Sequence, residues 1–302
     1  MELPVNQLIF EKMFSTEEQC LTYLIELKYK NGFKCKKSGH DKYWLLSRRR
    51  VGCRQCKQMC SVTSGTIFEQ SNKPLHLWYR VIWHMVAQKN GISAKGLQNI
   101  MGFGSYRTAW VWLHKLRMIT VLTSRNKLSG KVEVDETFLG GYSEGKRGRG
   151  AEGKILVVIA IEVLEKGTGR ARLSVIPDAT RKSLKDFIET NIESNSELIT
   201  DGWKSYKKIE GYKHTVMEAD EQDNNSLPHI HRIASLLKRW LLGTHQNYVT
   251  GNKTQNYLDE FTFRYNRRKS GSRGLLFQRV MEQAVFHPPI KYQKVVNPAK
   301  IN

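Results

Sequence analysis

The pattern of apolar and polar positions changes along the chain and separates three regions. Residues 73 to about 125 carry apolar side chains, such as Trp78, Ile82 and Met85, near the 3.6-residue spacing of an amphipathic helix. From Leu128 onward, short apolar runs typical of strands alternate with helix-like segments. Residues 1 to about 70 contain all of the cysteines. The pattern therefore predicts an N-terminal module, a helical segment and an α/β region.

The region after residue 128 predicts a mixed α/β sheet flanked by helices. Three strands come first, and the first of them ends at Asp135. A later strand runs straight into Asp201, and Pro228, a residue well tolerated in a first helical turn, begins a helix. We expect strands at 131–135, 154–164, 171–176, 197–200 and 214–217, and helices at 183–192, 228–242 and 256–268.

The charge of the chain favours a polyanionic partner. Its 302 residues include 49 Lys and Arg against 28 Asp and Glu, a formal net charge of +21, and nucleic acid is the first candidate. The alternatives are solvated basic faces or an acidic membrane surface, although no basic amphipathic helix stands out. The N-terminal stretch lacks the apolar run of a signal peptide, and the longest apolar run, residues 155–161, is too short to span a bilayer. We therefore expect a cytoplasmic protein.

Four of the five cysteines lie close together in sequence, which favours a metal site over a disulfide framework. Cys53 and Cys56 form a C-x-x-C pair, and Cys35 precedes them in the stretch FKCKKSGH. Thiolates at this spacing are typical of zinc ribbons, in which Zn²⁺ is held tetrahedrally. The sequence therefore predicts a structural zinc site.

The fourth zinc ligand is the open question of this module. A second C-x-x-C pair would place a cysteine at position 38, where the chain has Ser38. His40 is the expected substitute because imidazole suits tetrahedral zinc, and Cys60 is a second choice. The alternative is a ribbon without metal that folds on apolar contacts.

Residues 91–117 fit two helices joined by a short glycine-containing turn, the pattern of a helix-turn-helix. Ser93 and Ser105 are expected as the N-caps of these helices. The second helix would present basic side chains to a DNA groove and its phosphates. The alternative is an ordinary helical hairpin with a solvated basic face. The residues expected to be available to DNA are Tyr106, Arg107, Lys115 and Arg117.

Acidic residues follow two of the apolar strands. Asp135 and Glu136 interrupt the stretch KVEVDETFLGGY, and Asp201 follows the stretch ELIT. Carboxylates are rarely buried unless they are paired or coordinate a metal, so these side chains either reach solvent or hold something. The strand pattern alone leaves both possibilities open for Asp135 and Glu136.

Several motifs in a fixed order resemble the DDE-type insertion-sequence transposases of the Merlin-related group, which have an N-terminal zinc ribbon and an RNase H-like catalytic core. In chain order the core motifs are VDETFLGGY, GKRGRGAEGK, ITDGWKSY, SLLKRWLLGTHQ and YLDEFTFRYNRR. The stretch CRQCKQMCSVTSGTIFEQSNKPLHLWY is similar to the zinc ribbon of the same family. The resemblance extends from about residue 30 to about residue 270.

The resemblance implies a division of the chain and a reaction. We expect a zinc-ribbon-like module, a helix-turn-helix segment, an RNase H-like core and a tail at residues 1–72, 73–127, 128–290 and 291–302. In such a core the strands that carry Asp135 and Asp201 lie side by side, so both carboxylates would hold Mg²⁺ or Mn²⁺ for phosphoryl transfer. Glu136 is either a supporting group or a solvated neighbour.

The third position of the catalytic motif departs from the usual glutamate, because the resemblance aligns His231 there. Imidazole is a poorer ligand for Mg²⁺ than a carboxylate but is acceptable to Mn²⁺. Lys238 lies two helical turns later on the same helix face and is expected to touch phosphate. An alternative carboxylate would come from the acids just upstream, which are Glu218, Asp220, Glu221 and Asp223.

The resemblance implies a transposase that binds the terminal inverted repeats of an element in double-stranded DNA, cleaves them and transfers the strands. Two ends act together, so a homodimer or larger assembly is expected. The alternatives are a DNA-binding protein that has lost catalysis and a nuclease of the same fold that does not join strands. Further expected phosphate contacts are Lys146, Arg147 and Arg149 in the glycine-rich loop, and Arg239 beside Lys238.

Overall fold

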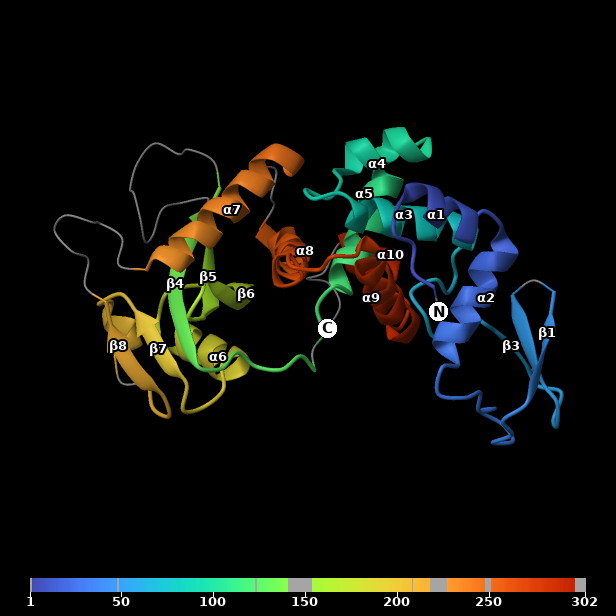
Figure 1. Ribbon diagram of the computed structural model, residues 1–302, viewed down its shortest axis with the longest axis horizontal. Helices are drawn as coiled ribbons and strands as arrows, with labels where there is room; N and C mark the ends of the chain where they lie inside the picture. Colours follow the sequence, from blue (N-terminus) through green and yellow to red (C-terminus); the bar gives the residue numbers. More distant parts are fainter. Residues whose placement is uncertain are drawn as a thin grey trace. The chain divides into compact units, whose positions relative to one another are not determined.

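The computed structural model describes residues 2–47, 49–122, 124–140, 154–207, 209–217, 227–247 and 251–296 (Figure 1). The chain divides into two compact units, one formed by Met1–Leu122 with Ser270–Asn302 and the other by Thr123–Lys269. The expected core of residues 128–290 therefore includes a helix that belongs to the first unit.

The first unit combines a three-stranded antiparallel sheet with helices. Its strands pair in the order β1-β2-β3, and residue Tyr43 lies opposite Cys53. The strands are β1 (Tyr43–Leu46), β2 (Arg50–Cys53) and β3 (Met59–Ser61). The helices are α1 (Gln7–Met13), α2 (Glu17–Lys28), α3 (Leu75–Ala87), α4 (Ala94–Met101), α5 (Tyr106–Met118), α9 (Arg273–Phe286) and α10 (Tyr292–Val296).

Aromatic packing explains why α9 joins the first unit. Its Phe277 is fully buried and its ring lies 5.5 Å from that of Phe10 and 5.8 Å from that of Tyr79. The backbone N–H of Ile67 also donates to the carbonyl of Ala284, at 3.0 Å. Burial of large aromatic side chains is a strong stabilising contribution, so this long-range contact outweighs the sequence proximity of α9 to the α/β core.

The helices α4 and α5 begin where the sequence predicts. The side chain of Ser93 accepts a hydrogen bond from the N–H of Gly96, and Ser105 accepts one from the N–H of Arg107. Gly102 ends α4 in the left-handed conformation at φ +63°, which glycine adopts without steric cost. The two serine N-caps are therefore confirmed.

The second unit is a mixed α/β fold, as the sequence predicts. Its five strands pair in the order β6-β5-β4-β7-β8; β4, β5 and β6 are antiparallel, whereas β7 runs parallel to β4 and β8 parallel to β7. The strands are β4 (Lys131–Leu139), β5 (Ile155–Val163), β6 (Thr168–Val175), β7 (Glu197–Thr200) and β8 (Lys213–Val216). The α-helices are α6 (Arg181–Asn191), α7 (Pro228–His245) and α8 (Thr254–Asn266), with 3-10 turns at Lys204–Tyr206 and Gly251–Lys253.

Helices cover both faces of this sheet (Figure 1). On one face, Val132 and Val134 of β4 pack with Leu184 and Ile188 of α6. On the other face, apolar residues of β5 and β6 pack with α7 and α8. Alternate residues of a strand point to opposite faces, so the odd-numbered positions of β4, including Asp135, lie on the face that α7 covers.

Candidate functional site

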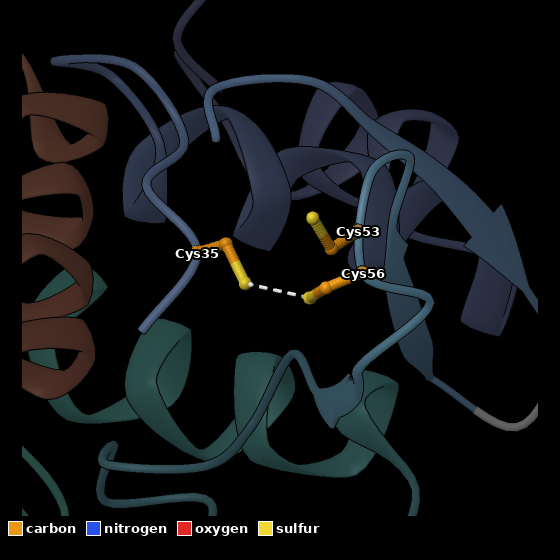
Figure 2. A group of neighbouring side chains, drawn as sticks. All are labelled: Cys35, Cys53 and Cys56. Atoms are coloured by element: carbon orange, nitrogen blue, oxygen red, sulfur yellow. Dashed lines mark hydrogen bonds between the residues drawn. The ribbon is translucent and has the colours of Figure 1, made fainter. Parts of the chain in front are cut away.

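The cysteine cluster of the first unit consists of Cys35, Cys53 and Cys56 (Figure 2). Their ligand atoms all lie within 4.8 Å of one another, and the Sγ atoms of Cys35 and Cys56 are 3.6 Å apart. Cys53 ends β2, Cys56 lies in the turn that follows, and Cys35 lies in the loop after α2. Tetrahedral zinc with Zn–S bonds of about 2.3 Å needs sulfur atoms at roughly this separation, so the three thiols fit a zinc ion.

Hydrogen bonds prepare these thiols for a metal. The side chain of Ser38, with further bonds from the backbone of Ser38 and Lys37, lowers the pKa of Cys35 to about 6. At Cys53 burial raises the pKa, but hydrogen bonds from Ser38 and from the backbone of Cys56 outweigh it and leave the pKa lowered. A lowered pKa favours the thiolate, which is the form that binds zinc.

Ser38, not His40, lies at the fourth corner of the cluster. The Ser38 Oγ is 3.4 Å from the Sγ of Cys53, whereas the group of close ligand atoms does not include His40. The His40 Nδ1 instead lies 3.8 Å from a carboxylate oxygen of Asp41. Cys60 is exposed and also lies outside the group. Position 38 thus occupies the place expected of a ribbon ligand, although its side chain is a hydroxyl.

Asp135 lies in the middle of β4, since the strand continues to Leu139, and not at a strand end as expected. The strand that ends is its parallel neighbour β7, which stops at Thr200. The register pairs Glu133 with Ile199, so continuing it by two residues brings Asp135 level with Asp201. Parallel strands lie about 4.8 Å apart, so the two aspartates stand side by side on one face of the sheet.

Asp135 and Asp201 are half-buried carboxylates with other acidic groups nearby, and this environment disfavours the charged form of Asp135. Burial, together with the charges of Glu136 and Asp201, raises the pKa of Asp135 to about 7. The buried hydroxyl of Tyr206 lies among the same acids, and burial together with their charges raises the pKa of Tyr206. The N–H of Trp203 donates to Asp201 Oδ1 at 3.1 Å. A divalent cation between the aspartates would relieve this repulsion, and carboxylate oxygens suit Mg²⁺ or Mn²⁺.

Glu133 is a site residue that the sequence analysis missed. It lies two residues before Asp135 on the same face of β4 and is only 5% exposed. Its Oε2 accepts the backbone N–H of Ile230 in α7 at 3.0 Å, and the Nε2 of His229 lies 4.0 Å from its Oε1. An acid at an inward position of an apolar strand is the sequence signal that would have identified it.

His231 lies in the first turn of α7 and is exposed. It is near enough to Glu133 to contribute to lowering the pKa of that acid, against the larger effect of burial. Within the described residues, the cysteine cluster is the one group of three or more His, Cys, Asp or Glu side chains close enough to hold a metal, so His231 does not form such a group with Asp135 and Asp201. The four upstream acids between residues 218 and 223 lie outside the described residues.

The expected DNA contacts have different outcomes. Arg117 is 1% exposed, which corrects the expectation that it contacts phosphate; it lies on the inward face of α5. Arg107 is exposed and its guanidinium lies over the ring of Tyr292, 5.2 Å from its centre, while Lys115 is half-buried. Lys238 and Arg239 are exposed on α7. The expected contacts Lys146, Arg147 and Arg149 lie outside the described residues.

Lys238 has a second cation nearby. Partial burial lowers the pKa of Lys238, and the charge of Lys154 at the start of β5 lowers it further. Two neighbouring ammonium groups repel each other, so an anion such as a phosphate would stabilise both. This surface of α7 is therefore suited to a nucleic-acid backbone.

Comparison with known proteins matches both units. Residues 127–266 match the ISXO2-like transposase domain, and residues 15–62 match the transposase zinc-ribbon domain. An uncharacterized protein in transposable element ISH50 of Halobacterium salinarum is 24% identical over 302 residues, covering 91% of this chain and 99% of that protein.

The zinc-ribbon-like region and the helix-flanked mixed sheet both match domains of the transposases of insertion elements. The chain therefore carries a domain similar to that of the ISXO2-like transposases, together with a transposase zinc ribbon. In the described part of the chain, no helix is both long enough and apolar enough to span a bilayer.

Proposed function

We propose that this protein binds the terminal inverted repeats of its insertion element and catalyses metal-dependent cleavage and transfer of the DNA strands. The observation that carries the proposal is the register of β4 and β7, which brings Asp135 and Asp201 together within the matched transposase domain. The net charge of +21 supports a DNA partner. The strand order, with three antiparallel strands followed by two parallel ones, supports an RNase H-like core.

The proposed site divides the work among the chain's own residues. Asp135 and Asp201 would hold Mg²⁺ or Mn²⁺. When bound, such a metal would activate the attacking oxygen as a nucleophile and stabilise the leaving oxygen of a phosphodiester. Lys238, with Lys154 nearby, would hold the phosphate backbone by charge. Glu136 and Tyr206 lie close enough to the aspartates to interact with them electrostatically and would support the pair.

In the first unit, we propose that Cys35, Cys53 and Cys56 hold a structural zinc ion and that the helix pair α4–α5 contacts the element ends. The three thiols fit zinc, and exposed Arg107 at the start of α5 supports a contact with DNA. Arg117 is left out of this surface because it is buried. Cleavage at two element ends implies a dimer or larger assembly on the DNA.

The test uses duplexes that carry the inverted repeats flanking the gene, with Mg²⁺ or Mn²⁺ added. We expect strand cleavage and, with pre-cleaved ends, joining to a target duplex. Asp135→Asn and Asp201→Asn should each lower the cleavage rate on the order of a thousandfold, because several kcal/mol of transition-state stabilisation depend on the bound metal. The matched control is Asp186→Asn, which removes one exposed charge from α6 and should leave the rate unchanged.

Other outcomes distinguish the alternatives. Specific binding of the repeats without cleavage in either metal would make the protein a DNA-binding protein derived from a transposase. Cleavage without any joined product would make it a nuclease. Cleavage that survives both aspartate substitutions would contradict the proposed site.

A further inference from the structure

The first turn of α7 has no side-chain cap of its own. Leu227 occupies the N-cap position without a capping hydrogen bond, and Pro228 follows it without an N–H group. The N–H of His231 donates to the carbonyl of Leu227 at 3.1 Å. The N–H groups of His229 and Ile230 therefore need acceptors from elsewhere, because the first N–H groups of a helix have no partner within it.

Glu133 of β4 supplies the missing cap from the neighbouring strand. Its Oε2 accepts the N–H of Ile230 at 3.0 Å, and backbone hydrogen bonds from Ile230 and His229 counteract the rise in its pKa caused by burial. The imidazole of His229, 4.0 Å from Oε1, is a further neighbour. A carboxylate at a helix N-terminus is favoured by the helix dipole, which helps to explain how this acid remains buried.

The anchor joins two parts of the proposed site. Glu133 and Asp135 alternate along β4 and lie on one face, so the strand that holds the first aspartate also holds the first turn of α7. That turn carries His231, and the same helix carries Lys238 two turns later. A movement of the first turn would shift His231 relative to Asp135 and Asp201.

We propose that Glu133 is a positioning residue of the transposase site, which holds the first turn of α7, and with it His231, on the strand that carries Asp135. This inference rests on the proposed function. A capping role alone would affect stability, whereas a positioning role also affects the chemical step through His231. Misplacement of a group by a small distance is enough to slow an enzymatic reaction strongly.

The experiment measures strand cleavage by full-length Glu133→Ala and Glu133→Gln, each alone and combined with His231→Ala. Glu133→Ala should lower the cleavage rate about tenfold with little change in the DNA concentration at half-maximal rate. Glu133→Gln should recover much of this loss, since its amide oxygen still accepts the Ile230 N–H. In the His231→Ala background, Glu133→Ala should add no further loss, because both changes remove the same interaction.

Two further measurements separate positioning from loss of stability. Glu162→Ala removes another buried carboxylate of the same sheet, 7% exposed and bonded to Arg170 on β6, and should retain cleavage when assayed well below its unfolding temperature. Amide hydrogen exchange at Ile230 should speed up in Glu133→Ala but not in Glu162→Ala.

The outcomes are distinct. Unchanged cleavage by Glu133→Ala, or a full additional loss in the His231→Ala background, overturns the inference while the proposed function stands. A glutamine variant no better than the alanine variant also overturns it. Absence of cleavage by the wild-type chain in either metal overturns the proposed function itself, and the inference with it.

Discussion

The cysteine cluster of the first unit and the aspartate pair of the second unit both gather metal-ligating side chains, but from different stretches of chain. The cysteines come from a loop, the end of β2 and the turn after β2, all within a short segment. Asp135 and Asp201 come from strands far apart in sequence that meet only because β7 pairs with β4. The cluster is thus built by local geometry, and the pair by sheet topology.

The two groups also differ in what their ligands do when no metal is bound. Hydrogen bonds lower the pKa of Cys35 to about 6, so a zinc-ready thiolate is already favoured. Burial and neighbouring acids raise the pKa of Asp135 to about 7, so its charged form is disfavoured. The comparison suggests that the ribbon ligands serve folding, whereas the aspartates are kept together at a cost in stability, as is common for reactive sites.

The largest effect should come from removing a ribbon thiol. We expect Cys53→Ser to lower the zinc content from one ion per chain to nearly none and to unfold the ribbon, because structural zinc contributes on the order of 10 kcal/mol to folding. Metal analysis and protease sensitivity of residues 30–62 measure this. His40→Ala is the control and should keep its zinc; full retention by Cys53→Ser, or loss by His40→Ala, would contradict the assigned ligands.

The next largest effect concerns the free energy of unfolding, which the ionised aspartate pair is expected to lower. The pKa of folded Asp135, about 7, lies above its ordinary value of 3.8, so the ionisation of Asp135 removes stability as the pH rises from about 4 to 7. In metal-free protein, Asp135→Asn should therefore raise the free energy of unfolding by about 4 kcal/mol at pH 8 and change it little at pH 4. Chemical denaturation at both pH values measures the difference.

The same variant tests the metal. Adding Mn²⁺ should stabilise the wild-type chain, by about 2.7 kcal/mol at a hundredfold excess over Kd, and should not stabilise Asp135→Asn. If Asp135→Asn is less stable than wild type at pH 8, the ionised aspartate pair does not lower the stability of the fold. The proposed difference between the aspartate pair and the cysteine cluster would then be wrong.

A smaller effect should follow from completing the ribbon. Ser38→Cys places a thiolate at the fourth corner, where the Ser38 Oγ now lies 3.4 Å from Cys53 Sγ. Zinc transfer to a chromogenic chelator should slow about tenfold, because four thiolates hold Zn²⁺ more tightly than three with a hydroxyl or water. Ser38→Ala serves as the matched variant and should release zinc at least as fast as wild type. Equal release rates in all three would exclude position 38 from the site.

The smallest effect should concern the basic surface formed by Lys238 and Lys154. Lys238→Gln should weaken DNA binding a few-fold at moderate salt and reduce the slope of log affinity against log salt by about one. Lys185→Gln, on α6 and paired with Glu189 at 3.6 Å, should have no such effect. Equal loss from both variants would indicate general charge attraction and not a contact at Lys238.

Local signals account for the features that the sequence alone determined. The serine N-caps of α4 and α5, the C-x-x-C turn and the mixed order of strands and helices depend on side chains only a few residues apart. The motifs around Asp135 and Asp201 were sufficient to indicate the transposase family that the comparisons show. Residues close together in sequence determine these local conformations, so the sequence alone is enough to predict them.

Only the tertiary structure decided which side chains meet. It extended β4 beyond Asp135, buried Arg117, left His40 outside the cysteine cluster and attached α9 to the first unit. It also showed Glu133 capping α7, a contact between residues almost a hundred positions apart. Burial and capping partners depend on how distant elements pack, and the periodicity of a single segment contains no information about its partner.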